Sequence, residues 1–183
     1  GWEQPRYAGG VTYGSDITPT DPGSGGSGVT SGGFGGDGRG GHGGGAVRVD
    51  ASGAVVVSGK ITAKGGVFSS NQRTGGGSGG SIYIACQTIT GTNGTISANG
   101  GNGVWGGSPS GAGGGGRIAV LYNTTAQSNL NSAVGKPTIT FAANQGVYGG
   151  NLTFGGSTSA NWPQARPGTL CFPDTSVFLS EGR

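Results

Sequence analysis

The residues of this chain that could do chemistry are few, and their spacing forms no recognisable catalytic or metal site. The single histidine, His42, lies in GRGGHGGG, and only the distant Asp37 and Asp50 could join it, whereas a zinc site needs three or four ligands. The seven acidic residues are scattered, so no two carboxylates fall on adjacent repeats, as a polysaccharide-cleaving enzyme would need. We therefore expect no catalytic residue, no metal and no cofactor, and we predict that the protein is not an enzyme.

The two cysteines, Cys86 and Cys171, could form a disulfide bond or remain as free thiols. Cys86 continues the apolar alternation of the segment before it, which predicts an inward-facing side chain. Cys171 lies between Leu170 and Phe172 and is predicted to face outward. Both a disulfide bond and a buried free thiol at Cys86 stay open.

Aromatic side chains in predicted loops are the candidates for contact with a ligand or with another chain. Trp105 in GVWGGSPSG, Trp162 in ANWPQ and Tyr148 could stack on sugar rings or on a neighbouring subunit. Tyr83 and Tyr122 are expected in the same exposed set. The alternative is that these rings fill gaps between the loops and the core.

The composition restricts the classes of protein to which the chain can belong. Glycine supplies 47 of the 183 residues, and only 9% of the residues are charged, against about 25% in an ordinary domain. The carriers of the formal net charge of +3 are scattered, so we expect no nucleic-acid partner. No apolar stretch is long enough to span a membrane. Because the chain contains no methionine, we expect a mature or excised product.

A repeated unit of about 35 residues dominates the chain, since 43–66 aligns without a gap with 78–101. Each copy reads as a glycine pair, an alternating strand, a small-residue turn, a second strand ending in alanine, and Gly-Gly. Glycine pairs end at Gly10, Gly45, Gly80, Gly116 and Gly150. A fixed period of this length indicates a repeat architecture. We predict an all-β parallel β-helix or β-solenoid of about five rungs.

Stacked repeats would align their apolar residues into inward ladders. The predicted ladders are Val47, Ile82, Ile118, Leu152 and Leu170; Val49, Ile84, Val120, Phe154 and Phe172; and Ile61, Ile96 and Ile139. Alanines 63, 98 and 142 would fill tight corners. The alternative is an antiparallel β-sandwich, because Asn93-Gly94 and Ser58-Gly59 are placed like hairpin turns.

The glycine-rich connections at 23–45, 65–80 and 100–116 are either flexible loops or ordered segments. We favour partial order, with a polyproline-II-like form, because the connections occur in register with the repeat. Residues 123–137 are predicted to form a protruding loop. Residues 1–183 form one domain, with an N-terminal cap at 1–42, core repeats at 43–122 and a less regular part at 123–183.

The motifs at Gly43–Val49, Lys60–Gly66, Gly77–Ala85 and Gly113–Val120 resemble the glycine-rich repeat regions of large secreted bacterial surface proteins. The xGxIxAxG cadence within 43–101 is similar to the rungs of filamentous-haemagglutinin-type β-helices. The resemblance implies a secreted, extracellular or cell-surface β-solenoid with structural or adhesive duties. It supplies no catalytic residues.

We therefore expect a non-enzymatic extracellular structural module that associates end to end into a filament or surface array. The reason is that a solenoid end exposes unpaired backbone, which must be capped or must bind another chain. The terminal segments GWEQPRYAGGVTYG and GTLCFPDTSVFLSEGR are expected at these ends. The alternatives are a glycan-binding adhesin that uses Trp105 and Trp162, and an inert spacer in a longer surface protein.

Overall fold

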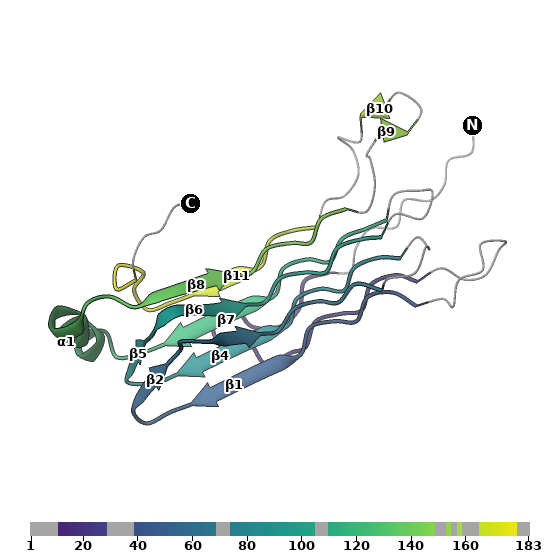
Figure 1. The fold of residues 1–183 in the computed structure, drawn as a ribbon. Coiled ribbons are helices and arrows are strands. Elements are labelled where there is room, and N and C mark those ends of the chain that lie inside the picture. Colours follow the sequence, from purple (N-terminus) through teal and green to yellow (C-terminus); the bar gives the residue numbers. More distant parts are fainter. Residues whose placement is uncertain are drawn as a thin grey trace.

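The computed structural model describes residues 11–28, 39–68, 74–104, 110–148 and 165–178, and the backbone of two short strands at 153–154 and 157–158 (Figure 1). The elements are β1 (Ala46–Asp50), β2 (Ala54–Val56), β3 (Lys60–Thr62), β4 (Ser81–Ala85), β5 (Thr88–Thr90), β6 (Thr92–Ser97), β7 (Arg117–Leu121), α1 (Thr124–Val134), β8 (Thr138–Ala142), β9 (Thr153–Phe154), β10 (Ser157–Thr158) and β11 (Thr169–Cys171). The structure is thus mostly β-strand, with one helix.

The main sheets are parallel, and they follow the repeat found in the sequence. Their strand orders are β1-β4-β7-β11, β2-β5 and β3-β6-β8. Val47 lies opposite Ile82, and Ile61 lies opposite Ile96, as the 35-residue offset predicts. The predicted antiparallel sandwich is wrong, because β9–β10 is the only antiparallel pair in the part of the chain that the structure describes.

Figure 1 shows two layers, one made of β1, β4, β7 and β11 and the other of β3, β6 and β8, with strands running in opposite directions. The short strands β2 and β5 join the layers at one end. Alternation along each strand sends one set of side chains between the layers. The fully buried members of this core are Ile82, Ile84, Ile89, Ile96, Ile118 and Val120.

A stack of five equivalent rungs is not formed by the described residues. Residues 11–13 belong to no strand. The fourth strand of the first sheet is β11, in which Leu170 lies opposite Ile118. Phe154, predicted for that stack, lies in β9 and pairs with β10. Leu152 lies outside the described residues.

The third predicted ladder is wrong in its last member. A register shift between Thr92 and Gly94 marks a β-bulge, and Asn93 adopts a left-handed conformation there, with φ 56°. After the shift, Ile96 lies opposite Phe141, and Ile139 lies opposite Gly94. Ala143, and not Ala142, is the buried counterpart of alanines 63 and 98. The Asn-Gly pair therefore marks a bulge, not a hairpin turn.

The predicted protruding loop at 123–137 contains α1. Asn123 caps its first turn, since its Oδ1 accepts a hydrogen bond from the Ala126 N–H at 2.9 Å. Gly135 ends it with φ 87°, where glycine avoids the strain of a side chain. Gln127 is the buried residue of this helix, whereas Ala126 and Leu130 are half-buried and Val134 is exposed. A polar side chain, and not the apolar ones, thus makes the closest contact with the rest of the molecule.

The described parts of the glycine-rich connections are ordered, and they hydrogen-bond with a three-residue period. In the segment 75–80, the N–H groups of Gly75 and Ser78 bond to Ser27 and Ser24, those of Gly76 and Gly79 to Gly111 and Gly114, and those of Gly77 and Gly80 to Gly66 and Ala63. Successive N–H groups thus donate to three different neighbouring segments in turn. This is the three residues per turn of the polyproline II form, which has no internal hydrogen bonds.

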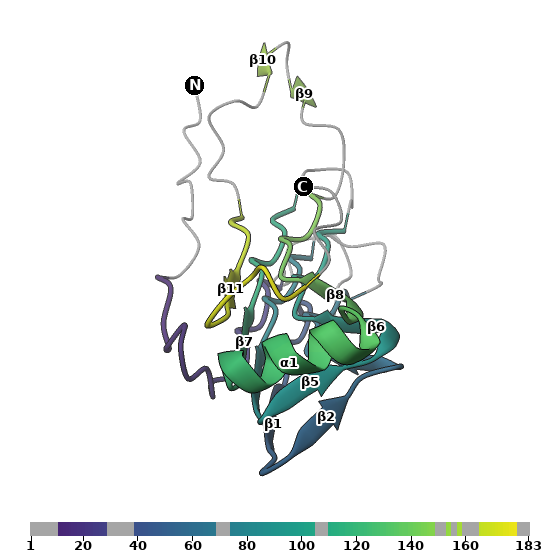
Figure 2. The same cartoon turned by 90° about the vertical axis from the view of Figure 1, so that its left-hand side faces the viewer.

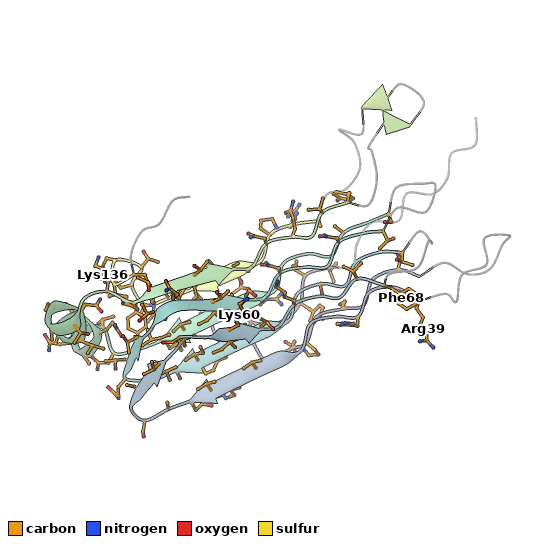
Figure 3. All side chains as sticks on the ribbon, viewed as in Figure 1. Arg39, Lys60, Phe68 and Lys136 are labelled. Carbon is orange, nitrogen blue, oxygen red and sulfur yellow. The ribbon has the colours of Figure 1, made fainter. Side chains whose placement is uncertain are left out.

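At most of the described glycines in these segments, close packing leaves no room for a side chain. A Cβ on Gly77 would overlap the carbonyl oxygen of His42, which is backbone and cannot swing aside. In Figure 3 the strands and α1 carry many side chains, whereas the glycine-rich segments beyond them carry fewer. Backbone contacts therefore stabilise this half of the molecule.

Replacing Gly77 by alanine tests this packing. We expect Gly77→Ala to lower the free energy of unfolding by about 3 kcal/mol, because the new methyl group forces neighbouring backbones apart. Gly53→Ala is the matched control, since a Cβ there meets nothing within 4 Å. Urea denaturation followed by circular dichroism measures both variants. Equal stability of the two variants would contradict the packed arrangement.

Candidate functional site

The predicted aromatic contact residues do not form an exposed cluster among the described residues. Trp105 and Trp162 lie outside them. Tyr148 is half-buried, and its hydroxyl accepts a hydrogen bond from the Ala165 N–H at 2.6 Å. Tyr83 and Tyr122 were expected to be exposed, but each is only 7% exposed.

Both cysteines are free and half-buried. Cys86 packs against the core, as its phase predicts, and burial raises the pKa of its thiol. Cys171 lies opposite Ala119, whereas the residue before it lies opposite the core residue Ile118. Cys171 is therefore on the outer face of the sheet, as predicted. The disulfide alternative is therefore not realised in this structure.

Neither a metal-ligand cluster nor a membrane-spanning helix occurs in the described ranges. His42 is exposed, and its Nδ1 lies 3.2 Å from the carbonyl oxygen of Gly43. No group of three or more His, Cys, Asp or Glu side chains within those ranges could hold a metal ion. Nor does any helix there have the length and apolar character needed to cross a bilayer.

The N-terminal segment 11–22 lies along the outer face of the first sheet instead of across the end of the strand stack. Asp16 Oδ1 accepts hydrogen bonds from Arg117 Nε on β7 and from Thr169 Oγ1 on β11, both at 3.0 Å. The Ser81 hydroxyl donates to the Asp21 carbonyl oxygen at 2.6 Å. A cleft of about 180 Å³ lies beside these contacts, and the two charged residues that line it, Asp16 and Arg117, are paired with each other.

A second cleft, of about 350 Å³, lies between α1 and the C-terminal segment. Its charged groups already have partners. Lys136 Nζ donates to the Ser176 carbonyl oxygen at 2.5 Å. Asp174 accepts from the Ser176 N–H and hydroxyl, each at 2.8 Å, and the bond from the N–H is the main cause of its lowered pKa. These contacts hold the C-terminal segment in place.

Aromatic rings cover the core at the end of the molecule that carries β8 and β11, although these two strands are the outermost of their sheets and Leu170 is 47% exposed. Four rings, from the residue after β7, from β8 and from the C-terminal segment, meet edge-on or tilted above the core, with neighbouring centroids 4.8 to 6.0 Å apart: Tyr122, Phe141, Phe172 and Phe178. Phe178 and Val177 are buried there, and the Tyr122 hydroxyl donates to the Asp174 carbonyl oxygen. We name this the capped end.

Helix α1 completes the capped end by covering the edge of β5, as Figure 2 shows. The fully buried Gln127 makes the connection through its side-chain amide. Its Oε1 accepts from the Ile89 N–H at 2.7 Å, and its Nε2 donates to the Ile89 carbonyl oxygen at 3.0 Å. The amide thus replaces the peptide group that a further strand would have supplied.

At the opposite end, no described residue forms such a cover. Strands β1, β2 and β3 are the outermost strands of their sheets, so each has one edge without a strand partner among the described residues. Their inward side chains Val47, Val49, Val55 and Ile61 are only half-buried, whereas their counterparts one turn further on are fully buried. We name this surface the open end.

The open end carries charges of both signs on the outer face of β1. Arg48 Nε lies 2.6 Å from Asp50 Oδ2, and each side chain is 54% exposed. The hydrogen bond to Asp50 raises the pKa of Arg48, whose guanidinium also lies 4.6 Å from the Tyr83 ring centroid. On β3, Lys60 is exposed (Figure 3). Sequence reasoning missed Arg48 and Asp50 as site residues, although the alternation in VRVD already placed both on the outer face.

Replacing Gln127 tests the role of α1. Gln127→Ala should lower the free energy of unfolding by about 2 to 3 kcal/mol, because the buried N–H and carbonyl groups of Ile89 lose their partners. Asn129→Ala, at an exposed position of the same helix, should change it by less than about 0.5 kcal/mol. Denaturant titration gives both values. Faster hydrogen exchange at the Ile89 amide in Gln127→Ala alone would locate the loss; unchanged exchange would contradict the capping role.

Comparison with known proteins assigns the chain to no family. Neither a protein-family model, nor a curated protein, nor a solved structure matches it. Its function must therefore be inferred from the two ends of the fold and from the sequence.

Proposed function

We propose that this chain is a non-enzymatic extracellular structural module, a short β-solenoid that associates end to end through its open end. The observation that carries the proposal is the contrast between the two ends. One end is closed by four aromatic rings and by Gln127 of α1. At the other end, no described residue covers the edges of β1, β2 and β3 or their half-buried core valines.

Unpaired strand edges are a ready template for another chain. The backbone N–H and carbonyl groups of β1 supply hydrogen bonds, and Val47 and Val49 supply apolar contact. Burying the latter adds about 25 cal/mol for each Å² of apolar surface removed from water. A surface that offers both backbone hydrogen bonds and apolar contact fits a protein partner better than a small polar ligand.

The extracellular placement is supported by the sequence. Only 9% of the residues are charged, and the repeats resemble those of secreted bacterial surface proteins. A filament of stacked copies would need both ends to be open, and the capped end disfavours it. We therefore propose association through the open end alone. Glycan binding stays a prediction of the sequence, since Trp105 and Trp162 lie outside the described residues.

Removing a backbone donor from the open edge tests this function. We expect the protein to self-associate with rising concentration in sedimentation velocity, and Arg48→Pro to weaken the association by more than about tenfold, because proline lacks the N–H group. Arg48→Ala keeps that N–H and should weaken it less.

The control for the other end is Ser128→Lys, on the exposed face of α1. It should leave association unchanged. A wild-type protein that stays monomeric at millimolar concentration would contradict the proposed function. Weakening by Ser128→Lys would instead show that the capped end takes part.

A further inference from the structure

We infer that the partner at the open end is a second copy of this chain, bound about a two-fold axis at Val49, so that β1 pairs antiparallel with β1 of that copy. The inference rests on the proposed function and specifies its geometry. Two observations lead to it: the direction of the free backbone groups, and the signs and spacing of the charges.

The free backbone groups of β1 belong to alternate residues. At the two ends of the β1–β4 ladder, the Gly45 carbonyl oxygen accepts from Ser81 N–H, and the Ala51 N–H donates to the Ala85 carbonyl oxygen. In a parallel ladder the residues that bond to a given neighbour alternate along the strand. Odd-numbered residues of β1 therefore face β4, and the peptide groups of Ala46, Arg48 and Asp50 face the free edge.

A two-fold axis can relate such an edge to itself in a few registers, and the charges separate them. If the axis passes through Arg48, two guanidinium groups lie directly opposite each other, and if it passes through Asp50, two carboxylates do. Like charges in that position are destabilising. With the axis at Val49, each Arg48 lies opposite Asp50 of the other copy, and these two residues form the hydrogen-bonded pairs.

The same register is also favourable for the apolar side chains. Val49 then lies opposite Val49 of the second copy in a non-hydrogen-bonded pair, in which Cα atoms approach to about 4.5 Å. Both valines are half-buried in one copy alone and point toward the core side of the sheet. Pairing would extend the first sheet continuously from one copy into the other.

Edge strands often avoid association by carrying charge. A single sign of charge repels a second copy, but β1 carries one residue of each sign, two positions apart. That arrangement is self-complementary under two-fold symmetry. Since the two-fold symmetry uses the open end of both copies, this contact closes on itself as a dimer.

The test uses two charge-reversal variants, Arg48→Asp and Asp50→Arg. Each alone places four like charges at the dimer axis, so each should self-associate at least about tenfold more weakly than the wild type. Mixed in equal amounts, the two should form a heterodimer, because the new carboxylate of one variant then lies opposite the new guanidinium of the other. The remaining native pair, Asp50 of the first variant and Arg48 of the second, is also of opposite sign. The double variant R48D/D50R should dimerise again.

Monomer stability cannot explain rescue by mixing, since the mixture contains the same two variants. Sedimentation velocity with one variant fluorescently labelled measures the heterodimer. If the wild type dimerises and mixing fails to restore association, the two-fold register is wrong while the proposed function stands. Wild-type species larger than the dimer would likewise overturn the closed pair. A wild type that stays monomeric overturns the inference together with the proposed function.

Discussion

The structure depends on backbone-to-backbone hydrogen bonding between extended segments that have no Cβ atoms to hold them apart. The three-residue alternation at 75–80 gives each turn three neighbours, so buried N–H groups find partners without a regular sheet. Such packing tolerates only glycine at positions like Gly77, which explains how a chain so poor in large apolar residues stays ordered beyond its strands. The isoleucine core therefore has to stabilise only the part of the molecule that contains the strands.

Because the apolar core is confined to the strand-containing part, the two ends of the strand stack differ in how they are covered. A stack of parallel strands must end somewhere, and each end presents unpaired peptide groups and the side of the core. At the capped end, material that is not part of the repeat meets these needs for β5 and for the core: Gln127 supplies amide groups to β5, and Phe178 covers the core. At the open end, none of the described residues supplies either, although the same physical needs exist there.

The repeat itself could be predicted from the sequence, because equal spacing brings equivalent apolar residues together in parallel strands. Val47 and Ile82 illustrate this directly. Phe141 could not be predicted as the partner of Ile96, because α1 interrupts the 35-residue spacing and the bulge at Asn93 shifts the register by one further residue. Helix α1 was not predicted for a different reason: the segment departs from the repeat, and its one buried side chain, Gln127, is polar.

The open end shows where repeat counting misleads. Five glycine pairs suggest five rungs with the chain termini at the two ends, yet the segment 11–22 turns aside and lies on the outer face, held by Asp16 and Arg117. Among the described residues, the first strand of the stack is therefore β1. For that reason Arg48 and Asp50, unremarkable as members of an alternating strand, become the charges that any chain approaching this edge must meet. Because their signs are opposite, this edge favours a partner strand that places a negative charge opposite Arg48 and a positive charge opposite Asp50. A second copy of β1, related by a two-fold axis, carries its charges in that order.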